Sequence, residues 1–231
     1  MGSALPVILW QSFSGRAVRC LEAPLLTVGN NAAGVEELLG NGLLLCPCCG
    51  GRLGGWGRAA RRPVFTAGRS FSVWLTPRRS RCASCGRTHV LLPCWLLARR
   101  CDDGVMVIGD MLARAARGQG FRSVAAETGV PAWTVRDRLR RFRSSAGQIR
   151  EFFTRLAYAL AVDPVPLDPA GSAAGDAVVA VAAAADAARG RWPAIAVSGW
   201  EVASAVTLGS LLSPSVLFAR SHGDSPVFAL A

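Results

Sequence analysis

Two short cysteine motifs decide how this chain is interpreted: CPCCG at residues 46–50 and CASCG at residues 82–86. Each contains two cysteines that are separated by two residues and followed by glycine, so both sulfurs of one tight turn can reach a single ion. The glycine tolerates a positive φ, which turns backbone N–H groups toward the sulfurs. We therefore predict one structural Zn²⁺ in a closed, tetrahedral site. The predicted ligands are Cys46, Cys49, Cys82 and Cys85.

The first motif contains a third cysteine, Cys48, and His89 follows the second motif. We assign Cys49 as the ligand because it repeats the spacing between Cys82 and Cys85. Cys48 is then a spare thiol, and His89 is expected to pack or to hydrogen-bond beside the turn; whether either joins the site is left open. The cysteines that have no partner at ligand spacing are expected in the core: Cys20, Cys94 and Cys101.

The residues around these motifs indicate a β-rich region. Residues 51–81 are rich in glycine, arginine and aromatic residues, which predicts short strands joined by turns. Together with the cysteines they describe a zinc ribbon over residues 46–101 that carries a β-hairpin arm. The preceding residues 1–45 are expected to form a β-rich segment, with two short strands over 5–28 and a helical turn over 34–39.

Arginine is concentrated in the middle of the chain. The 231 residues include 26 arginines, no lysine and 15 acidic residues, which gives a formal net charge of +11. Residues 46–101 hold eleven arginines and no acid, and residues 102–150 hold nine arginines and five acids. The net charge is −1 over residues 1–45 and −3 over residues 151–231. A polyanion such as nucleic acid is therefore expected to bind between residues 46 and 150.

The periodicity changes to that of helices after residue 101. Apolar residues predict a helix from Asp102 or Asp103, as N-cap, to Gly118, and further helices over 123–128, 132–142 and 149–160. Within residues 121–142, Ala125, Gly129 and Val135 have the spacing of a DNA-binding helix-turn-helix. One departure is Arg138, at a place where an apolar residue is common, and Leu139 and Phe142 are expected to take over its packing.

In this arrangement residues 132–142 form the recognition helix, whose N-terminal half enters the major groove of double-stranded DNA. The residues expected nearest the bases are Ala132, Trp133, Thr134, Arg136 and Asp137. Arg136 is the best candidate for a guanine contact, because guanidinium matches the O6 and N7 acceptors. Phosphate contacts are expected from Arg140, Arg141 and Arg143, and from the ribbon residues Arg58, Arg61, Arg62, Arg78, Arg79 and Arg81. The alternative is a helical hairpin with a solvated basic face.

A proline-rich linker, DPVPLDPAG at residues 163–171, ends the predicted helix-turn-helix domain of residues 102–162. Residues 172–231 then form a helical tail, with helices expected over 173–189 and 201–212. Because the tail is acidic, we expect it to act as a separate packing or homo-oligomerisation element that does not contact DNA. The predicted fold class is α+β: a small zinc ribbon, a mainly helical region and a helical tail.

Membrane insertion and catalysis are not expected. The most apolar stretch, residues 194–219, is rich in small polar residues and is interrupted by Pro214, and the N-terminus lacks the basic region of a signal peptide. We therefore expect a cytoplasmic, nucleoid-associated protein with reduced cysteines. The acidic residues of the tail are scattered, and neither histidine belongs to a catalytic motif, so we predict that the chain is not an enzyme.

Three segments carry a resemblance: CPCCGGRLGGWGRAARR at 46–62, RRSRCASCGRTHVLLP at 78–93 and GFRSVAAETGVPAWTVRDRLRRF at 120–142. They resemble an uncharacterised family of actinobacterial proteins with a zinc ribbon and a helix-turn-helix. That family is similar to the N-terminal DNA-binding part of insertion-sequence transposases. The resemblance implies zinc and DNA, but no reaction.

Three functions therefore compete. The first is a sequence-specific double-stranded DNA-binding protein, either a transcription regulator or a transposase-derived module. The second is a transposition enzyme or subunit whose catalytic domain is missing or separate. The third is a protein-interaction module, because zinc ribbons also bind proteins.

Overall fold

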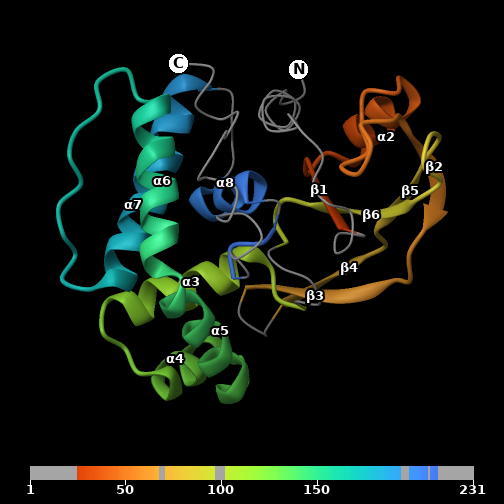
Figure 1. Cartoon of the computed structure of the whole chain (residues 1–231). Coiled ribbons are helices and arrows are strands. Elements are labelled where there is room, and N and C mark those ends of the chain that lie inside the picture. The colour runs from red at the N-terminus through yellow and green to blue at the C-terminus, as the bar shows by residue number, and fades with distance from the viewer. Residues whose placement is uncertain (1–24, 68–70, 97–101, 194–197, 208, 213–231) are drawn as a thin grey trace.

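The computed structural model describes residues 25–67, 71–96, 102–193, 198–207 and 209–212. It is α+β, as predicted, with a sheet in the N-terminal part and helices after it (Figure 1). The two strands predicted over residues 5–28 lie largely outside the described residues, apart from β1 (Leu25–Val28). Cys20 and Cys101 also lie outside them, whereas Cys94 is buried as expected.

The strands in the described part of the chain form two sheets. The larger sheet has the order β1, β6 (Thr88–Pro93), β5 (Arg78–Cys82) and β2 (Leu53–Arg58), and β1 pairs with β6 in parallel. The smaller sheet pairs β3 (Arg62–Ala67) with β4 (Phe71–Leu75). Helix α2 (Ala32–Gly40) lies beside the larger sheet and buries Val35 and Leu39 in a shared apolar cluster. This helix is longer than the single turn that the sequence predicted.

Strands β2 to β5 form one bent hairpin arm, residues 53–82. The chain runs outward along β2 and β3 and returns along β4 and β5, and both pairs are antiparallel. Between the two halves, the N–H of Ala59 donates to the carbonyl of Pro77 at 2.8 Å, so the pairing continues through the bend. The short strands predicted for residues 51–81 are therefore present, and the arm brings the two cysteine motifs back together at its base.

Within the described residues, six helices follow the sheet. They are α3 (Val105–Ala116), α4 (Phe121–Thr128), α5 (Ala132–Ser144), α6 (Ala146–Leu160), α7 (Ala173–Arg191) and α8 (Gly199–Val206). Each predicted helix is present, with shifted ends, and α8 ends earlier than the predicted residue 212. The predicted N-cap is wrong, because α3 begins after Gly104 and no side chain caps it.

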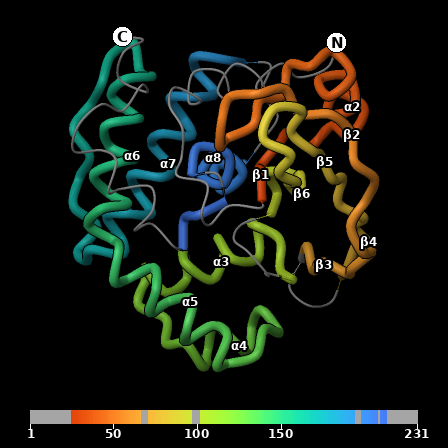
Figure 2. The backbone as a smooth tube through the Cα atoms, turned by 45° about the vertical axis from the view of Figure 1, so that its right-hand side comes forward, coloured from red at the N-terminus to blue at the C-terminus, as the bar shows by residue number. Residues whose placement is uncertain are grey.

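The prediction that the tail packs separately is also wrong for its described residues. Helices α3 to α8 share one hydrophobic core, and α7 runs beside α6 (Figures 1 and 2). The alanines of α7 allow this close approach, because their small side chains leave room for the neighbouring helix. Those fully buried are Ala177, Ala180, Ala184, Ala185 and Ala188. The proline-rich linker lets α7 return along α6. Asp186 of α7 is exposed, whereas Asp176 forms an ion pair with Arg150 of α6 at 3.3 Å.

Hydrogen bonds join the sheet to the helices. The side chain of Asn30, after β1, donates to Glu201 of α8 at 2.8 Å. The hydroxyl of Ser204 on α8 donates to the carbonyl of Leu96 at 2.7 Å. The N–H of Gly104 donates to the carbonyl of Phe65 on β3 at 2.7 Å. Among the described helices, none is both long and apolar enough to cross a membrane.

Candidate metal centre and nucleic-acid interface

The four predicted ligands lie together at the base of the hairpin arm. The Sγ atoms of Cys46, Cys49, Cys82 and Cys85 all lie within 4.8 Å of one another. Cys46 and Cys85 are 3.7 Å apart, and Cys49 and Cys82 are 3.4 Å apart, measured between their sulfurs. Four thiolates around Zn²⁺ at 2.3 Å would have sulfurs about 3.8 Å apart, whereas a disulfide would bring two to about 2.0 Å. The cluster therefore fits a tetrahedral metal ion.

Both cysteine turns have the same local geometry. Gly50 and Gly86 have φ values of 71° and 70°, which L side chains rarely adopt. The N–H of Gly50 donates to the carbonyl of Cys46 at 2.9 Å, and the N–H of Gly86 donates to the carbonyl of Cys82 at 3.0 Å. Each first sulfur also accepts a backbone N–H, that of Cys46 from Cys48 at 3.4 Å and that of Cys82 from Cys85 at 3.5 Å. The repeated Cys-Gly spacing in the sequence thus corresponds to two equivalent turns whose backbone donors face a sulfur.

The surroundings of Cys46 and Cys82 shift the pKa values of these two thiols in opposite directions. Burial raises the pKa of Cys46 to about 12. Burial also acts to raise the pKa of Cys82, but hydrogen bonds from the Cys85 N–H and from the Cys49 thiol outweigh it and lower this pKa to about 6. Cys82 is therefore more ready than Cys46 to act as a thiolate ligand, and Cys46 must lose a proton when a metal binds.

His89 faces this cluster from β6. It is buried, and its Nε2 lies 3.4 Å from the sulfur of Cys46. Cys46, Cys48 and His89 form a second group whose ligand atoms lie within 4.8 Å of one another. Cys46 is common to both groups, but Cys48 is disulfide-bonded and is not the spare, reduced thiol that was expected. The four-cysteine group is therefore the candidate metal site. The position of His89 agrees with the expected hydrogen bond beside the turn.

Helices α4 and α5 are joined by residues 129–131. Gly129 has a φ of 67°, and its N–H donates to the carbonyl of Ala125 at 2.9 Å, which ends α4. Val124 and Val135 are fully buried between the helices. Gly129 and Val135 thus occupy the turn and core positions that their spacing predicted.

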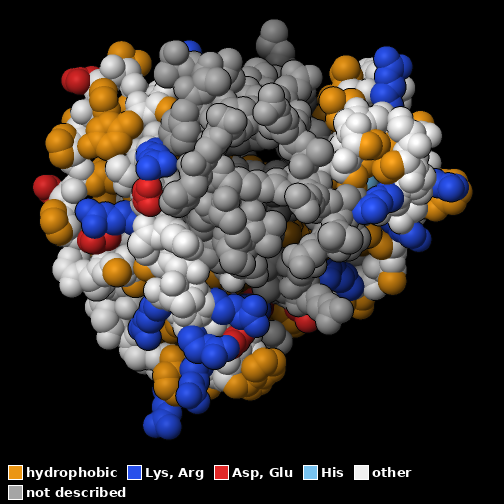
Figure 3. All heavy atoms as spheres, viewed as in Figure 1, with side chains coloured by type: hydrophobic (Ala, Val, Ile, Leu, Met, Phe, Trp, Pro, Cys, Tyr) orange, Lys and Arg blue, Asp and Glu red, His pale blue; other side chains and the backbone are white. Residues whose placement is uncertain are grey.

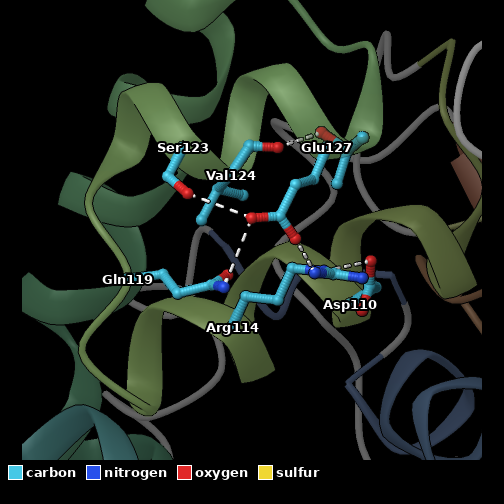
Figure 4. A network of polar contacts seen from close by, with 7 residues as sticks. Asp110, Arg114, Gln119, Ser123, Val124 and Glu127 are labelled. Atoms are coloured by element: carbon cyan, nitrogen blue, oxygen red, sulfur yellow. Dashed lines mark hydrogen bonds and ion pairs between the residues drawn. The ribbon is translucent and has the colours of Figure 1, made fainter.

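A polar network holds α4 against α3 (Figure 4). Arg114 of α3 forms ion pairs with Asp110, at 2.8 Å, and with Glu127 of α4. The Glu127 carboxylate also accepts hydrogen bonds from Ser123, at 3.0 Å, and from Gln119, at 3.3 Å. The network lies at the surface, and it fixes α4 in the position from which α5 turns away.

The predicted base-contacting residues differ in their exposure to solvent and in their existing ion pairs. Trp133 is 75% exposed, Arg136 is exposed and Thr134 is half-buried. Asp137 accepts from Arg140 at 2.9 Å and from Arg141 at 2.8 Å, and these contacts lower its pKa. The predicted phosphate contacts of Arg140 and Arg141 therefore compete with Asp137. Among the ion pairs between described residues, none includes Arg136 or Arg143.

The structure differs from the sequence-based expectation at Arg138, whose packing Leu139 and Phe142 were expected to take over. Arg138 is buried on α5, and its Nη2 lies 2.8 Å from Oδ2 of the buried Asp103. Leu139 and Phe142 are also buried, but they pack beside Arg138 and do not replace it. Two signals in the sequence could have indicated this ion pair. One is an arginine, Arg138, at an apolar position, and the other is an aspartate, Asp103, just before a helix.

The arginines predicted along the DNA backbone differ in their exposure and in the groups they contact. Arg78 forms an ion pair with Glu36 at 2.7 Å, and Arg58 reaches the same carboxylate at 3.9 Å. Arg61 and Arg81 are exposed and lie over tryptophan rings, while Arg62 and Arg79 are half-buried. In the space-filling view, arginine side chains gather over the α4–α5 end and over the strands (Figure 3).

The family comparison covers this part of the chain. Residues 46–136 match a family described as a domain of unknown function, DUF6431. The matched segment begins at Cys46 and ends within α5, so it contains the four clustered cysteines and the turn between α4 and α5. No curated protein and no solved structure matches the chain.

Proposed function

We propose that this protein is a sequence-specific double-stranded DNA-binding protein in which a zinc ribbon supports a helix-turn-helix. The observation that carries the proposal is the exposed N-terminal half of α5, where Trp133 and Arg136 project from a helix anchored by buried residues. A rigid helix with an exposed arginine and an apolar side chain suits the donors, acceptors and methyl groups of the major groove.

The proposed metal has a structural role. Cys46, Cys49, Cys82 and Cys85 would hold Zn²⁺ and would fill its four positions, so no position remains for substrate. The metal would tie the two ends of the hairpin arm together at its base. The arginines of the arm would then follow the DNA backbone beside α5, with Arg61, Arg62, Arg79 and Arg81 less neutralised by acids than Arg58 and Arg78.

The biological role we infer is that of a transcription regulator or a transposase-derived DNA-binding module, located with the nucleoid. The resemblance of the cysteine motifs and of residues 120–142 to a family that is similar to the N-terminal DNA-binding part of insertion-sequence transposases supports the second of these. No residue is assigned a catalytic role. If the protein takes part in transposition, the strand-joining carboxylates would have to come from another chain.

Selection of bound sequences from a random duplex pool tests the proposal, with the zinc-loaded full chain as bait. We expect the enriched pool to converge on one motif that contains guanine. A matched control is Arg155→Ala, because Arg155 is an exposed, ion-paired arginine on α6. This variant should enrich the same motif. A pool that shows no sequence preference after repeated rounds would exclude sequence-specific binding.

A further inference from the structure

Two exposed tryptophans on the hairpin arm carry arginines over their rings. The Cζ atom of Arg81 lies 4.6 Å from the ring centroid of Trp56, and that of Arg61 lies 4.7 Å from the ring centroid of Trp74. Trp56 is 49% exposed and Trp74 is 60% exposed. Contacts to duplex phosphates would explain the arginines, but they leave the exposed aromatic rings without a role.

The second cysteine turn holds one of these arginines in place. The Nε of Arg81 donates to the carbonyl of Gly86 at 3.1 Å, and its guanidinium lies over Trp56. Arg81 pairs with Gly54 across the strands, and the irregularity of β2 between Gly55 and Arg58 includes Trp56, whose ring lies under the Arg81 guanidinium. A guanidinium that is fixed on a ring loses little entropy when it binds a phosphate.

The other pair has a similar local arrangement in the outer half of the arm. Trp74 pairs with Pro63 across β3 and β4, and both are exposed, whereas the neighbouring Val64 is fully buried. Alternation along the strand therefore puts Trp74 on the face opposite Val64. Arg61, two residues before Pro63, lies over this ring. Each half of the arm thus presents one arginine–tryptophan pair to solvent.

This chemistry fits unpaired nucleotides. Bases in a duplex cover one another's faces, whereas unpaired bases offer a π-face that stacks on aromatic rings, with arginine nearby for the phosphates. The arm lies within residues 46–101, which contain eleven arginines and no acid, so its charge complements a polyanion. We propose that the arm binds single-stranded DNA, with unpaired bases stacked on Trp56 and Trp74 and phosphates bound by Arg81 and Arg61. The inference extends the proposed DNA binding but uses a surface other than α5.

The test compares two labelled oligonucleotides of equal length and charge, one of thymidines and one of abasic deoxyribose phosphates. Fluorescence anisotropy is measured with the zinc-loaded full chain. Since base–aromatic stacking depends on bases, we expect the abasic strand to bind at least about tenfold more weakly. Trp56→Ala and Trp74→Ala should each weaken binding of the thymidine strand by about fivefold to a hundredfold and leave that of the abasic strand unchanged.

Two controls separate this inference from the proposed function. Tyr158→Ala removes an exposed aromatic residue of α6 and should leave both affinities unchanged. Trp133→Ala should weaken binding of the selected duplex but not of the thymidine strand. If Trp133→Ala leaves duplex binding unchanged while Trp56→Ala and Trp74→Ala weaken binding of the thymidine strand, the role of α5 is contradicted and the arm site stands.

Equal affinity for the thymidine and abasic strands would overturn the inference, because binding would then depend on charge alone. Unchanged affinity in both tryptophan variants would overturn it as well. If an alanine variant does not fold, Trp56→Phe and Trp74→Phe keep a smaller ring and should give intermediate affinities. Stacking would be contradicted if the phenylalanine variants bound the thymidine strand as weakly as the parent protein binds the abasic strand.

Discussion

Arg138 of α5 and Asp103, just before α3, form a buried ion pair with 2.8 Å between Nη2 and Oδ2. Asp103 also lies beside β3, because a β-bridge links it to Phe65. The pair therefore ties the proposed recognition helix both to the start of the helical region and to the hairpin arm. The orientation of α5 relative to the arm depends on this contact.

Replacing Asp103 with asparagine should destabilise the fold. The substitution leaves the Arg138 charge buried without its counter-charge, which costs about 3–5 kcal/mol in the free energy of unfolding. Urea denaturation monitored by circular dichroism measures this change. In the double variant Asp103→Asn/Arg138→Leu, most of the loss should be recovered. A single variant within about 0.5 kcal/mol of the parent would show that the pair does not support the fold.

A second stability prediction concerns Gly109 on α3. A Cβ at this position would overlap the ring of Trp200 on α8. Gly109→Ala should therefore lower the free energy of unfolding by about 1–3 kcal/mol through overpacking. Gly147 on α6 is the matched control, since a Cβ there meets no atom within 4 Å. Gly147→Ala should be neutral or stabilising, and equal losses in both variants would contradict the packing of α8 on α3.

The choice of Cys49 over Cys48 as a metal ligand can be tested directly. Cys49 belongs to the four-sulfur cluster, whereas Cys48 lies with Cys46 and His89. Elemental analysis of protein purified without chelator should find one zinc per chain in Cys48→Ser, as in the parent, and much less in Cys49→Ser. The reverse result would assign the ligands to the group with His89.

Zinc affinity should fall as the pH is lowered. In the metal-free protein burial raises the pKa of Cys46 to about 12, so this thiol is protonated at neutral pH and must release its proton to bind zinc. The pKa of Cys82 is lowered to about 6, so its proton adds to the effect only below that pH. We expect at least about a tenfold loss of affinity per pH unit near neutrality. Chelator competition at several pH values measures it, and a flat profile would exclude thiol ligands.

The sequence predicted features that depend on local spacing. The cysteine turns and the α4–α5 turn each rest on a glycine with positive φ and on nearby residues, so a short segment contains the whole signal. The pairing of Asp103 with Arg138 could not be found in this way, because the partners lie on different elements. The packing of α7 was missed because charge and a proline-rich linker were taken as signs of separation, while alanines that fit closely against α6 leave a weak hydrophobic pattern. The arginine–tryptophan pairs depend on strand register, which composition does not define.

Arg136 provides the most direct test of sequence-specific binding. The measurement is a titration of the parent, Arg136→Ala and Arg143→Ala on selected and scrambled duplexes at several salt concentrations. We predict that Arg136→Ala costs about 1–3 kcal/mol on the selected duplex and relaxes preference at one base pair. Arg143→Ala should weaken both duplexes alike and reduce the salt slope by about 0.9, as loss of one phosphate contact does. If a folded Arg136→Ala protein keeps both its affinity and its preference, the proposed docking of α5 is contradicted.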